Sequence, residues 1–195
     1  MMQKNTDFRY SRKELLALGF AAVGQEVLID RSCRFFGAQN MQLGDHVRID
    51  ANCVFGNDPK GMKIGSFVHI AVGVTVLGAG GLIMEDFTGL AAHTCIHTST
   101  DDYIGGAMTG PWAPAEFRNV TDAPVILRRH AVVGTGSVLL PGVELGVGVA
   151  IGALTVVRKS VPAFAIAVGN PMRIVGKRGR EMLDHEDQVR AQNRS

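Results

Sequence analysis

Residues 93–102 read HTCIHTSTDD and bring two histidines, a cysteine and two adjacent aspartates into one short stretch. A neutral imidazole is the natural general base near neutral pH, because it can take the proton of a hydroxyl group that attacks an electrophile. A carboxylate beside such a ring fixes its tautomer and raises its basicity. His93, His97, Asp101 and Asp102 are therefore candidates for proton transfer.

A six-residue period surrounds this stretch and determines where it lies in the fold. A large aliphatic or aromatic anchor returns every six positions, and a small or β-branched residue follows most anchors four positions later. A helix has a period of about 3.6 and a single strand a period of about 2, so neither explains a strict six. The anchors form six groups of three: Val23, Ile29, Phe35; Leu43, Ile49, Phe55; Ile64, Ile70, Val76; Met84, Leu90, Ile96; Leu127, Val133, Leu139; Leu145, Ile151, Val157.

Every break in this period follows the third hexad of a group. That pattern is typical of a triangular coil of three short strands, with all insertions at one corner. We therefore expect an all-β fold of about six triangular coils, stacked at the roughly 4.8 Å spacing of paired strands. Cys33 and Cys53 fall at inward positions and are expected to behave as small hydrophobic residues. A β-sandwich whose spacing arose by chance is the alternative.

Three segments lie outside the coils. Residues 1–22 are expected to form an N-terminal cap with a short helix, because Ser11 and Glu14 have the spacing of a capping box. The coils, residues 23–178, are interrupted by an external loop near 97–125, and loops of this length are usually functional or disordered. The polar residues 179–195 are expected to form a helical C-terminal tail.

The composition limits the classes of function. The chain has 195 residues, a formal net charge of +2 and only three cysteines. A nearly balanced charge argues against a nucleic-acid-binding protein, and no stretch approaches the roughly 20 apolar residues of a membrane span. Isolated cysteines fit a reducing compartment, so we expect a cytoplasmic protein without membrane insertion.

The repeats and the C-terminal run resemble the hexapeptide-repeat acyltransferases. The run VVGTGSVLLPGVELGVGVAIGALTVVRKSVPAFAIAVGNPMRIVGKR is similar to the end of galactoside- and maltose-type sugar O-acetyltransferases. The middle, with VHIAVGVTVLGAGGLIMEDFTGL and STDDYIGGAMTGP, is similar to cell-surface polysaccharide acetyltransferases. The resemblance implies a left-handed parallel β-helix, a homotrimer, acetyl-CoA as the donor and a sugar or nucleotide sugar as the acceptor, with no metal.

The resemblance also places the acceptor site. The catalytic histidine of the galactoside enzymes occupies the position of Asp101, and a tyrosine that touches their acceptor sugar occupies that of His69. It therefore implies that His69, which points outward beside an inward anchor, is the base for the acceptor hydroxyl or amine. Asp101 or Asp102 would orient its ring across a subunit interface.

Other histidines and the third cysteine leave alternatives open. His97 lies at the root of the loop, and His93 and His130 lie at coil corners, so each is an alternative base. Cys95 points outward, and an inert surface thiol is the expected role. We therefore expect direct attack of the acceptor on the thioester, without a covalent enzyme intermediate.

The donor residues follow from the resemblance position by position. Thr135 corresponds to a serine whose backbone amide contacts the thioester carbonyl, and Ala153 to a residue that lines the pantetheine groove. Lys159 and Arg173 correspond to cations near the nucleotide phosphates, to which such side chains are suited. Arg158 and Lys177 lie close to them in sequence and complete the expected acetyl-CoA site.

Three other functions are compatible with the repeat. A zinc enzyme of the γ-carbonic anhydrase type would use three histidines from neighbouring subunits, and His69, His93 and His97 invite that comparison. A β-helix can also be a non-catalytic scaffold. An antibiotic-modifying acetyltransferase would use the same chemistry on a different acceptor.

Overall fold

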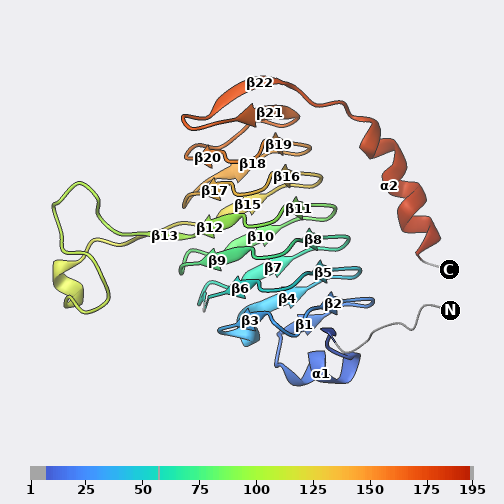
Figure 1. Ribbon diagram of the computed structural model, residues 1–195, viewed down its shortest axis with the longest axis horizontal. Helices are drawn as coiled ribbons and strands as arrows, with labels where there is room; N and C mark the ends of the chain where they lie inside the picture. The colour runs from blue at the N-terminus through green and yellow to red at the C-terminus, as the bar shows by residue number, and fades with distance from the viewer. Residues whose placement is uncertain (1–7, 57, 194–195) are drawn as a thin grey trace.

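The computed structural model describes residues 8–56 and 58–193, which form a left-handed parallel β-helix with triangular coils (Figure 1). Each complete coil contributes one short strand to each of three parallel sheets. Six coils are complete, and β21 (Ala165–Val168) adds part of a seventh by pairing with the second sheet. The predicted fold is confirmed, and each predicted anchor group corresponds to one complete coil.

The three sheets run the length of the stack in parallel register. The first contains β1 (Ala22–Val23), β4 (Met41–Leu43), β7 (Met62–Ile64), β10 (Leu82–Met84), β15 (Val125–Leu127) and β18 (Glu144–Leu145). The second contains β2 (Leu28–Ile29), β5 (Arg48–Ile49), β8 (His69–Ile70), β11 (Gly89–Leu90), β16 (Val132–Val133), β19 (Ala150–Ile151) and β21, with β22 (Arg173–Lys177) antiparallel at its edge. The third contains β3 (Arg34–Phe35), β6 (Val54–Phe55), β9 (Thr75–Leu77), β12 (Cys95–His97), β17 (Val138–Leu139) and β20 (Val156–Val157).

The core is a set of aliphatic columns inside the coils. Because successive strand residues point to opposite faces, the two-residue strands of the second to sixth coils bury their anchors and turn the preceding residue outward. In the first coil, Val23 and Phe35 are only partly buried. Cys33 and Cys53 are 2% and 0% exposed, as predicted for inward positions. Outward positions are thereby left for side chains that do not stabilise the core.

The corner between the first and second sheets carries an aromatic ladder. His46, Phe67, Phe87 and His130 all have a positive φ, and their rings stack with centroids 4.8, 4.7 and 5.0 Å apart. Such a backbone is costly for residues other than glycine, so stacking and coil geometry must hold it in place. We call these four residues the corner ladder.

The two ends of the β-helix are closed differently. Helix α1 (Arg12–Ala17) begins at Ser11, whose side chain accepts from the backbone of Glu14 while the Glu14 carboxylate accepts from Ser11, as the capping box predicted. At the other end, β22 folds back on β21 and leads to helix α2 (Glu181–Gln192). Figure 1 shows α2 running back along the side of the stack.

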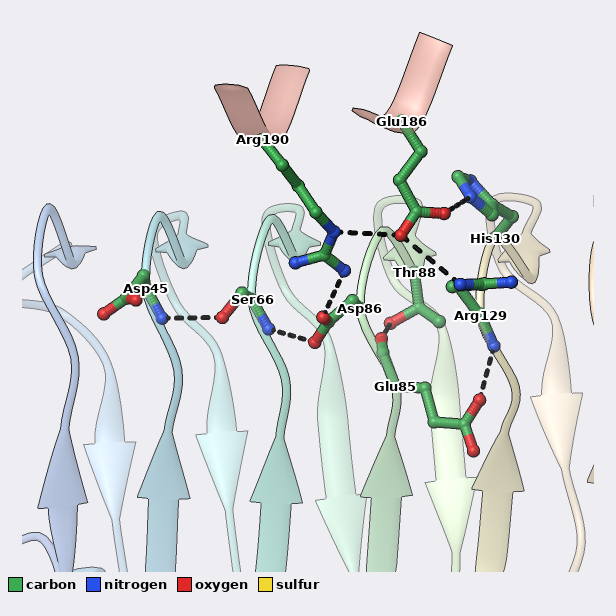
Figure 2. Close-up of polar contacts among 9 residues, drawn as sticks. All are labelled: Asp45, Ser66, Glu85, Asp86, Thr88, Arg129, His130, Glu186 and Arg190. Atoms are coloured by element: carbon green, nitrogen blue, oxygen red, sulfur yellow. Dashed lines mark hydrogen bonds and ion pairs between the residues drawn. The ribbon is translucent and has the colours of Figure 1, made fainter. Parts of the chain in front are cut away.

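Helix α2 is fastened to the corner ladder by ion pairs (Figure 2). Buried Glu186 places one carboxylate oxygen 2.9 Å from His130 Nε2 and the other 2.9 Å from Arg190 Nε. Arg190 also donates to Asp86 at 2.6 Å, and its guanidinium lies 4.9 Å from the centre of the Phe87 ring. The tail predicted from composition is therefore a docked helix with a specific anchor.

All insertions lie at the corner between the third and first sheets, as predicted. They include η2 (Ala38–Asn40) and a long excursion that contains β13 (Ser99–Thr100), η3 (Ala115–Phe117) and β14 (Thr121–Asp122). Figure 1 shows this excursion extending away from the stack. Buried Asp58 fixes its root, because its carboxylate accepts from Gly81 N at 2.7 Å and Thr98 Oγ1 at 3.2 Å.

Within the described residues, no helix combines the length and the apolar character that crossing a bilayer requires.

Candidate active site

The second sheet carries a histidine held by a carboxylate. His69 Nε2 on β8 lies 2.7 Å from Asp50 Oδ2, and Arg48 Nε on β5 lies 2.7 Å from the other oxygen of Asp50. Parallel stacking produces this contact, because Arg48 pairs with His69 across neighbouring coils and Asp50 directly follows β5. The His69 side chain remains 53% exposed, so a substrate can reach the ring.

The charges around Asp50 determine which nitrogen of His69 is available. Burial of Asp50 opposes its ionisation, but hydrogen bonds from His69 and Arg48 and the Arg48 charge outweigh burial and hold the pKa of Asp50 below its ordinary value. An ionised carboxylate only accepts hydrogen bonds, so Nε2 must carry the proton. The lone pair of the neutral ring is then on Nδ1, where it can accept a proton from a substrate.

The neighbouring coil leaves space beside this ring. Gly89 on β11 is in register with His69, and a Cβ added there would have no neighbour closer than 3.8 Å. The missing side chain therefore leaves the outer face open between His69 and Val132.

The loop aspartates do not contact His69 within one chain. Asp102 accepts a hydrogen bond from Ile104 N at 2.7 Å, and the carbonyl of Asp101 accepts one from Thr100 Oγ1 at 3.2 Å. The ring partner within the chain is Asp50 instead. The expected contact with Asp101 or Asp102 is one between subunits and stays a prediction.

His97 contacts Cys95 on the outer face of β12. The Cys95 Sγ lies 3.2 Å from His97 Nε2, a distance at which an imidazole could assist a thiol. Burial nevertheless raises the pKa of the Cys95 thiol, so it stays protonated at neutral pH. An activated cysteine nucleophile therefore has no support in this geometry.

The two corner histidines have structural contacts. His130 is 6% exposed and is paired with Glu186 under α2, so it is inaccessible to a substrate in this chain. The ring of His93 packs over Gly73, where an added Cβ would lie 2.4 Å from its Nδ1. Neither histidine has the exposed, carboxylate-held geometry of His69.

The expected donor residues on coils five and six lie at one corner. Exposed Thr135 and Ala153 occupy successive coils at the corner between the second and third sheets. The coils approach closely there, because a Cβ on Gly134 would lie 2.5 Å from Ala153 N. Within the described chain, the N–H of exposed Thr135 has no protein acceptor.

Three of the four expected cations gather at the last complete coil. Arg158 and Lys159 line a hollow of about 230 Å³ together with Met172, and Arg173 begins β22 directly after Met172. Lys177 lies at the opposite end of β22, about 13 Å away at the rise of an extended strand. The structure therefore separates Lys177 from the other three.

Among residues 8–56 and 58–193, no three His, Cys, Asp or Glu side chains lie close enough to hold a metal ion together. His69 is held by Asp50, and His97 contacts Cys95.

Sequence reasoning missed Asp50 as the partner of His69. A usable signal was present, since superposing the second and third anchor groups places Arg48 beside His69 and Asp50 at the adjoining corner. Glu186 and Asp58 had no comparable signal, because their partners lie in distant or irregular segments.

Comparisons with known proteins show to which family the chain belongs. No protein-family model matches the chain. An Escherichia coli dTDP-4-amino-4,6-dideoxy-D-glucose acyltransferase is 35% identical over 173 residues, which cover 89% of this chain and 90% of that protein. The E. coli K12 putative lipopolysaccharide biosynthesis O-acetyl transferase WbbJ is 26% identical over 73% of this chain and 71% of its own length.

Solved structures show the same relationship. The Bacillus cereus N-acyltransferase AntD, solved with dTDP and 3-hydroxybutyryl-CoA, superposes with a TM-score of 0.90 at 33% identity, covering 96% of this chain and 99% of that chain. A maltose O-acetyltransferase from Clostridium difficile shares the fold, with a TM-score of 0.59 at 22% identity over 92% of this chain and 79% of its own. The full-length similarity and the β-helix together show that the chain belongs to the hexapeptide-repeat sugar acyltransferases.

Proposed function

We propose that this acyl-CoA-dependent acyltransferase acylates the amino group of a nucleotide-linked amino sugar. One observation carries the proposal: a dTDP-amino-sugar acyltransferase is similar along nearly the whole length of both chains. AntD, which superposes closely, was solved with dTDP-4-amino-4,6-dideoxyglucose and coenzyme A in two of its variants. The sequence leads us to expect a sugar or nucleotide sugar that offers a hydroxyl or an amine, and these similarities favour the amine.

The chemistry is a direct attack of the amine on the thioester carbonyl. The amine nitrogen must lose a proton as its bond to the carbonyl carbon forms, and His69 Nδ1 accepts that proton. Asp50 holds the ring and stabilises the imidazolium, since its carboxylate is ionised. The C–S bond then breaks, and coenzyme A leaves as a thiolate that takes up a proton.

The donor lies toward the C-terminal coils. The unpaired Thr135 N–H is suited to stabilise the oxyanion of the tetrahedral intermediate. Ala153 leaves room for the pantetheine arm, and the hollow lined by Arg158 and Lys159 is suited to the nucleotide phosphates, with Arg173 beside it. Lys177 lies too far along β22 to join the same phosphate contact.

Assembly as a homotrimer completes the proposal. The excursion exposes large apolar side chains that one chain leaves uncovered: Ile104 is 99% exposed, Trp112 97% and Tyr103 89%. A patch of this kind typically marks an interface. In a trimer the excursion would bring Asp101 and Asp102 to a neighbouring subunit, and static light scattering that gave a monomer mass would contradict this assembly.

The cysteines and one similar protein support a cellular setting for this reaction. We place the reaction in the cytoplasm, because the unpaired cysteines fit a reducing compartment. Similarity to WbbJ supports a role in making cell-surface polysaccharide.

The test is acyl transfer by the purified chain. dTDP-4-amino-4,6-dideoxyglucose should accept an acyl group from acetyl-CoA or 3-hydroxybutyryl-CoA, whereas maltose should not. His69→Ala should lower kcat by about 10²–10⁴, and Asp50→Asn by less, because an amide still holds the ring. Failure to acylate any nucleotide-linked amino sugar would refute the proposed acceptor class.

Variants of the other candidates decide the assignment of the base. His97→Ala is the matched control, since His97 is also an outward strand histidine but contacts a thiol instead of a carboxylate. It should retain turnover within a fewfold of the parent. If His69→Ala kept parental kcat while Asp101→Asn or His97→Ala abolished turnover, the base would be misassigned.

A further inference from the structure

A groove of about 1290 Å³ begins at the Asp50 end of the His69–Asp50 pair. It runs over the first two coils of the second sheet to the N-terminal segment, with Asp50 and Arg48 at one end and Phe8 and Tyr10 at the other. Typical small-molecule sites measure roughly 300–1,000 Å³, so the groove has room for an extended ligand. It lies toward the opposite end of the stack from the expected donor hollow.

Three arginines face this groove with unused donors. Arg48 gives its Nε to Asp50, and Arg31 gives its Nη2 to Glu14. Arg9 has no hydrogen-bond or ion-pair partner through its guanidinium anywhere in the described part of the chain. The guanidinium presents several N–H groups in a fork that matches phosphate oxygens, so each arginine retains donors for an anion.

The acidic side chains on the groove are mostly engaged. The Glu14 carboxylate accepts from Ser11 and Arg31, which lowers its pKa to about 2 and keeps it ionised. Asp30 accepts from the backbone and hydroxyl of Ser32 at 2.9 and 2.6 Å. With Asp50 bound to His69 and Arg48, these carboxylates have partners, and Glu26 alone of the four has none within the described chain.

Two aromatic side chains form the far wall. Phe8 is 63% exposed although it lines a concave surface, and Tyr10 lies beside it with the Arg31 guanidinium 5.3 Å from its ring centre. Exposed rings next to cations are suited to stack a nucleobase while the cations bind its phosphates.

We propose that this groove binds the nucleoside diphosphate part of the acceptor, with the attached sugar at His69. The inference rests on the proposed function and adds the location of the acceptor. The base would stack on Phe8 or Tyr10, and Arg9, Arg31 and Arg48 would contact the diphosphate. Acceptor and donor would then approach from opposite ends of the stack and meet beside Gly89.

The experiment measures dTDP binding by calorimetry in a groove-filling variant. Leu28 lines the groove and is 39% exposed, so Leu28→Trp should fill it without disturbing the core. Leu16→Trp is the matched control, because Leu16 is 57% exposed on α1 and lies outside the groove. We expect Leu28→Trp to raise the Kd for dTDP and the KM for the nucleotide sugar at least tenfold, with the KM for acyl-CoA unchanged and Leu16→Trp like the parent.

A second variant tests the groove independently, in case Leu28→Trp does not fold. Arg9→Gln changes only a surface cation and should raise the Kd for dTDP about tenfold, the effect of losing one charge-assisted phosphate contact. If the parent acylates the nucleotide sugar while both variants keep its Kd for dTDP, the groove assignment is overturned and the proposed function stands. If the parent neither binds dTDP nor acylates any nucleotide-linked amino sugar, the proposed function fails and this inference fails with it.

Discussion

Glu186→Gln should release helix α2 from the corner ladder. Glu186 is 7% exposed and accepts charge-assisted contacts from His130 and Arg190 at 2.9 Å and from Arg129 at 3.4 Å. Glutamine has nearly the same shape but no charge, so it weakens these contacts without leaving a cavity. The ion pairs at the centre of Figure 2 are those that this substitution disrupts.

The size of the effect follows from these contacts. A hydrogen bond to a charged group contributes about 1.5–3 kcal/mol, and the amide oxygen retains part of it. A net loss of about 2 kcal/mol corresponds to roughly a thirtyfold increase in the equilibrium constant for local opening of α2. The β-helix below should keep its own stability, because its core columns do not depend on α2.

Hydrogen exchange of residues 181–192 measures this opening directly. Asp187→Asn is the matched control, since Asp187 is the neighbouring residue on α2, is exposed and loses the same charge. Protection of α2 should fall in Glu186→Gln and stay parental in Asp187→Asn. Equal protection in the two variants would refute the reasoning.

The same anchor should respond to acid. Burial opposes ionisation of Glu186, but contacts from His130 and Arg190 outweigh burial and lower its pKa in the folded protein. Because the pKa is lower in the folded protein, ionised Glu186 stabilises the docked α2 fully above the ordinary glutamate pKa of about 4.3. This stabilisation is lost as the pH falls through the pKa of Glu186 in the folded protein. The protection factor of α2 in the parent should therefore fall only below about pH 4.3, and a fall at higher pH would contradict this sign.

Two further predictions concern the donor side and the thiol. Lys159→Ala and Arg173→Ala should each raise the KM for acyl-CoA about five- to thirtyfold, the worth of one partly exposed phosphate contact, with little change in kcat. Lys177→Ala should change that KM less, because its strand position is remote, and steady-state kinetics on the three variants checks the order. Cys95 should react slowly with iodoacetamide at pH 7, since burial raises its pKa, and Cys95→Ser should keep parental turnover.

The coils were predictable because the six-residue repeat marks the positions whose side chains are buried. An inward position must be aliphatic in every coil, so the six-residue period specified strand positions, insertion corner and number of complete coils. The partial seventh coil was not predicted, because β21 follows a proline-containing turn that departs from the period. β22 was missed for a related reason: it runs antiparallel at a sheet edge and carries no repeat.

The site was less predictable, because the residue types at outward positions follow no repeating pattern. His69 was identified as outward and accessible, but its partner was sought among the loop aspartates and not on the neighbouring coil. Stacking places residues about twenty positions apart in contact, so Asp50 and His69 meet, and only a superposition of successive anchor groups reveals the contact in the sequence. His130 was equally hard to place from the sequence. It lies at a corner, where an exposed side chain is expected, but α2 from the far end of the chain buries it.

The proposed base, His69, lies on a strand, and this position has a mechanistic consequence. His69 and Arg48 belong to strands whose register is fixed by neighbours on both sides, and Asp50 directly follows one of them. A side chain held this way keeps its orientation before substrate arrives, which is the condition for efficient proton transfer. The loop aspartates belong to the excursion, which projects from the stack (Figure 1). In the proposed mechanism, Asp101 and Asp102 are therefore better suited to closing the site over a bound acceptor, while the β-helix would hold His69 as the base.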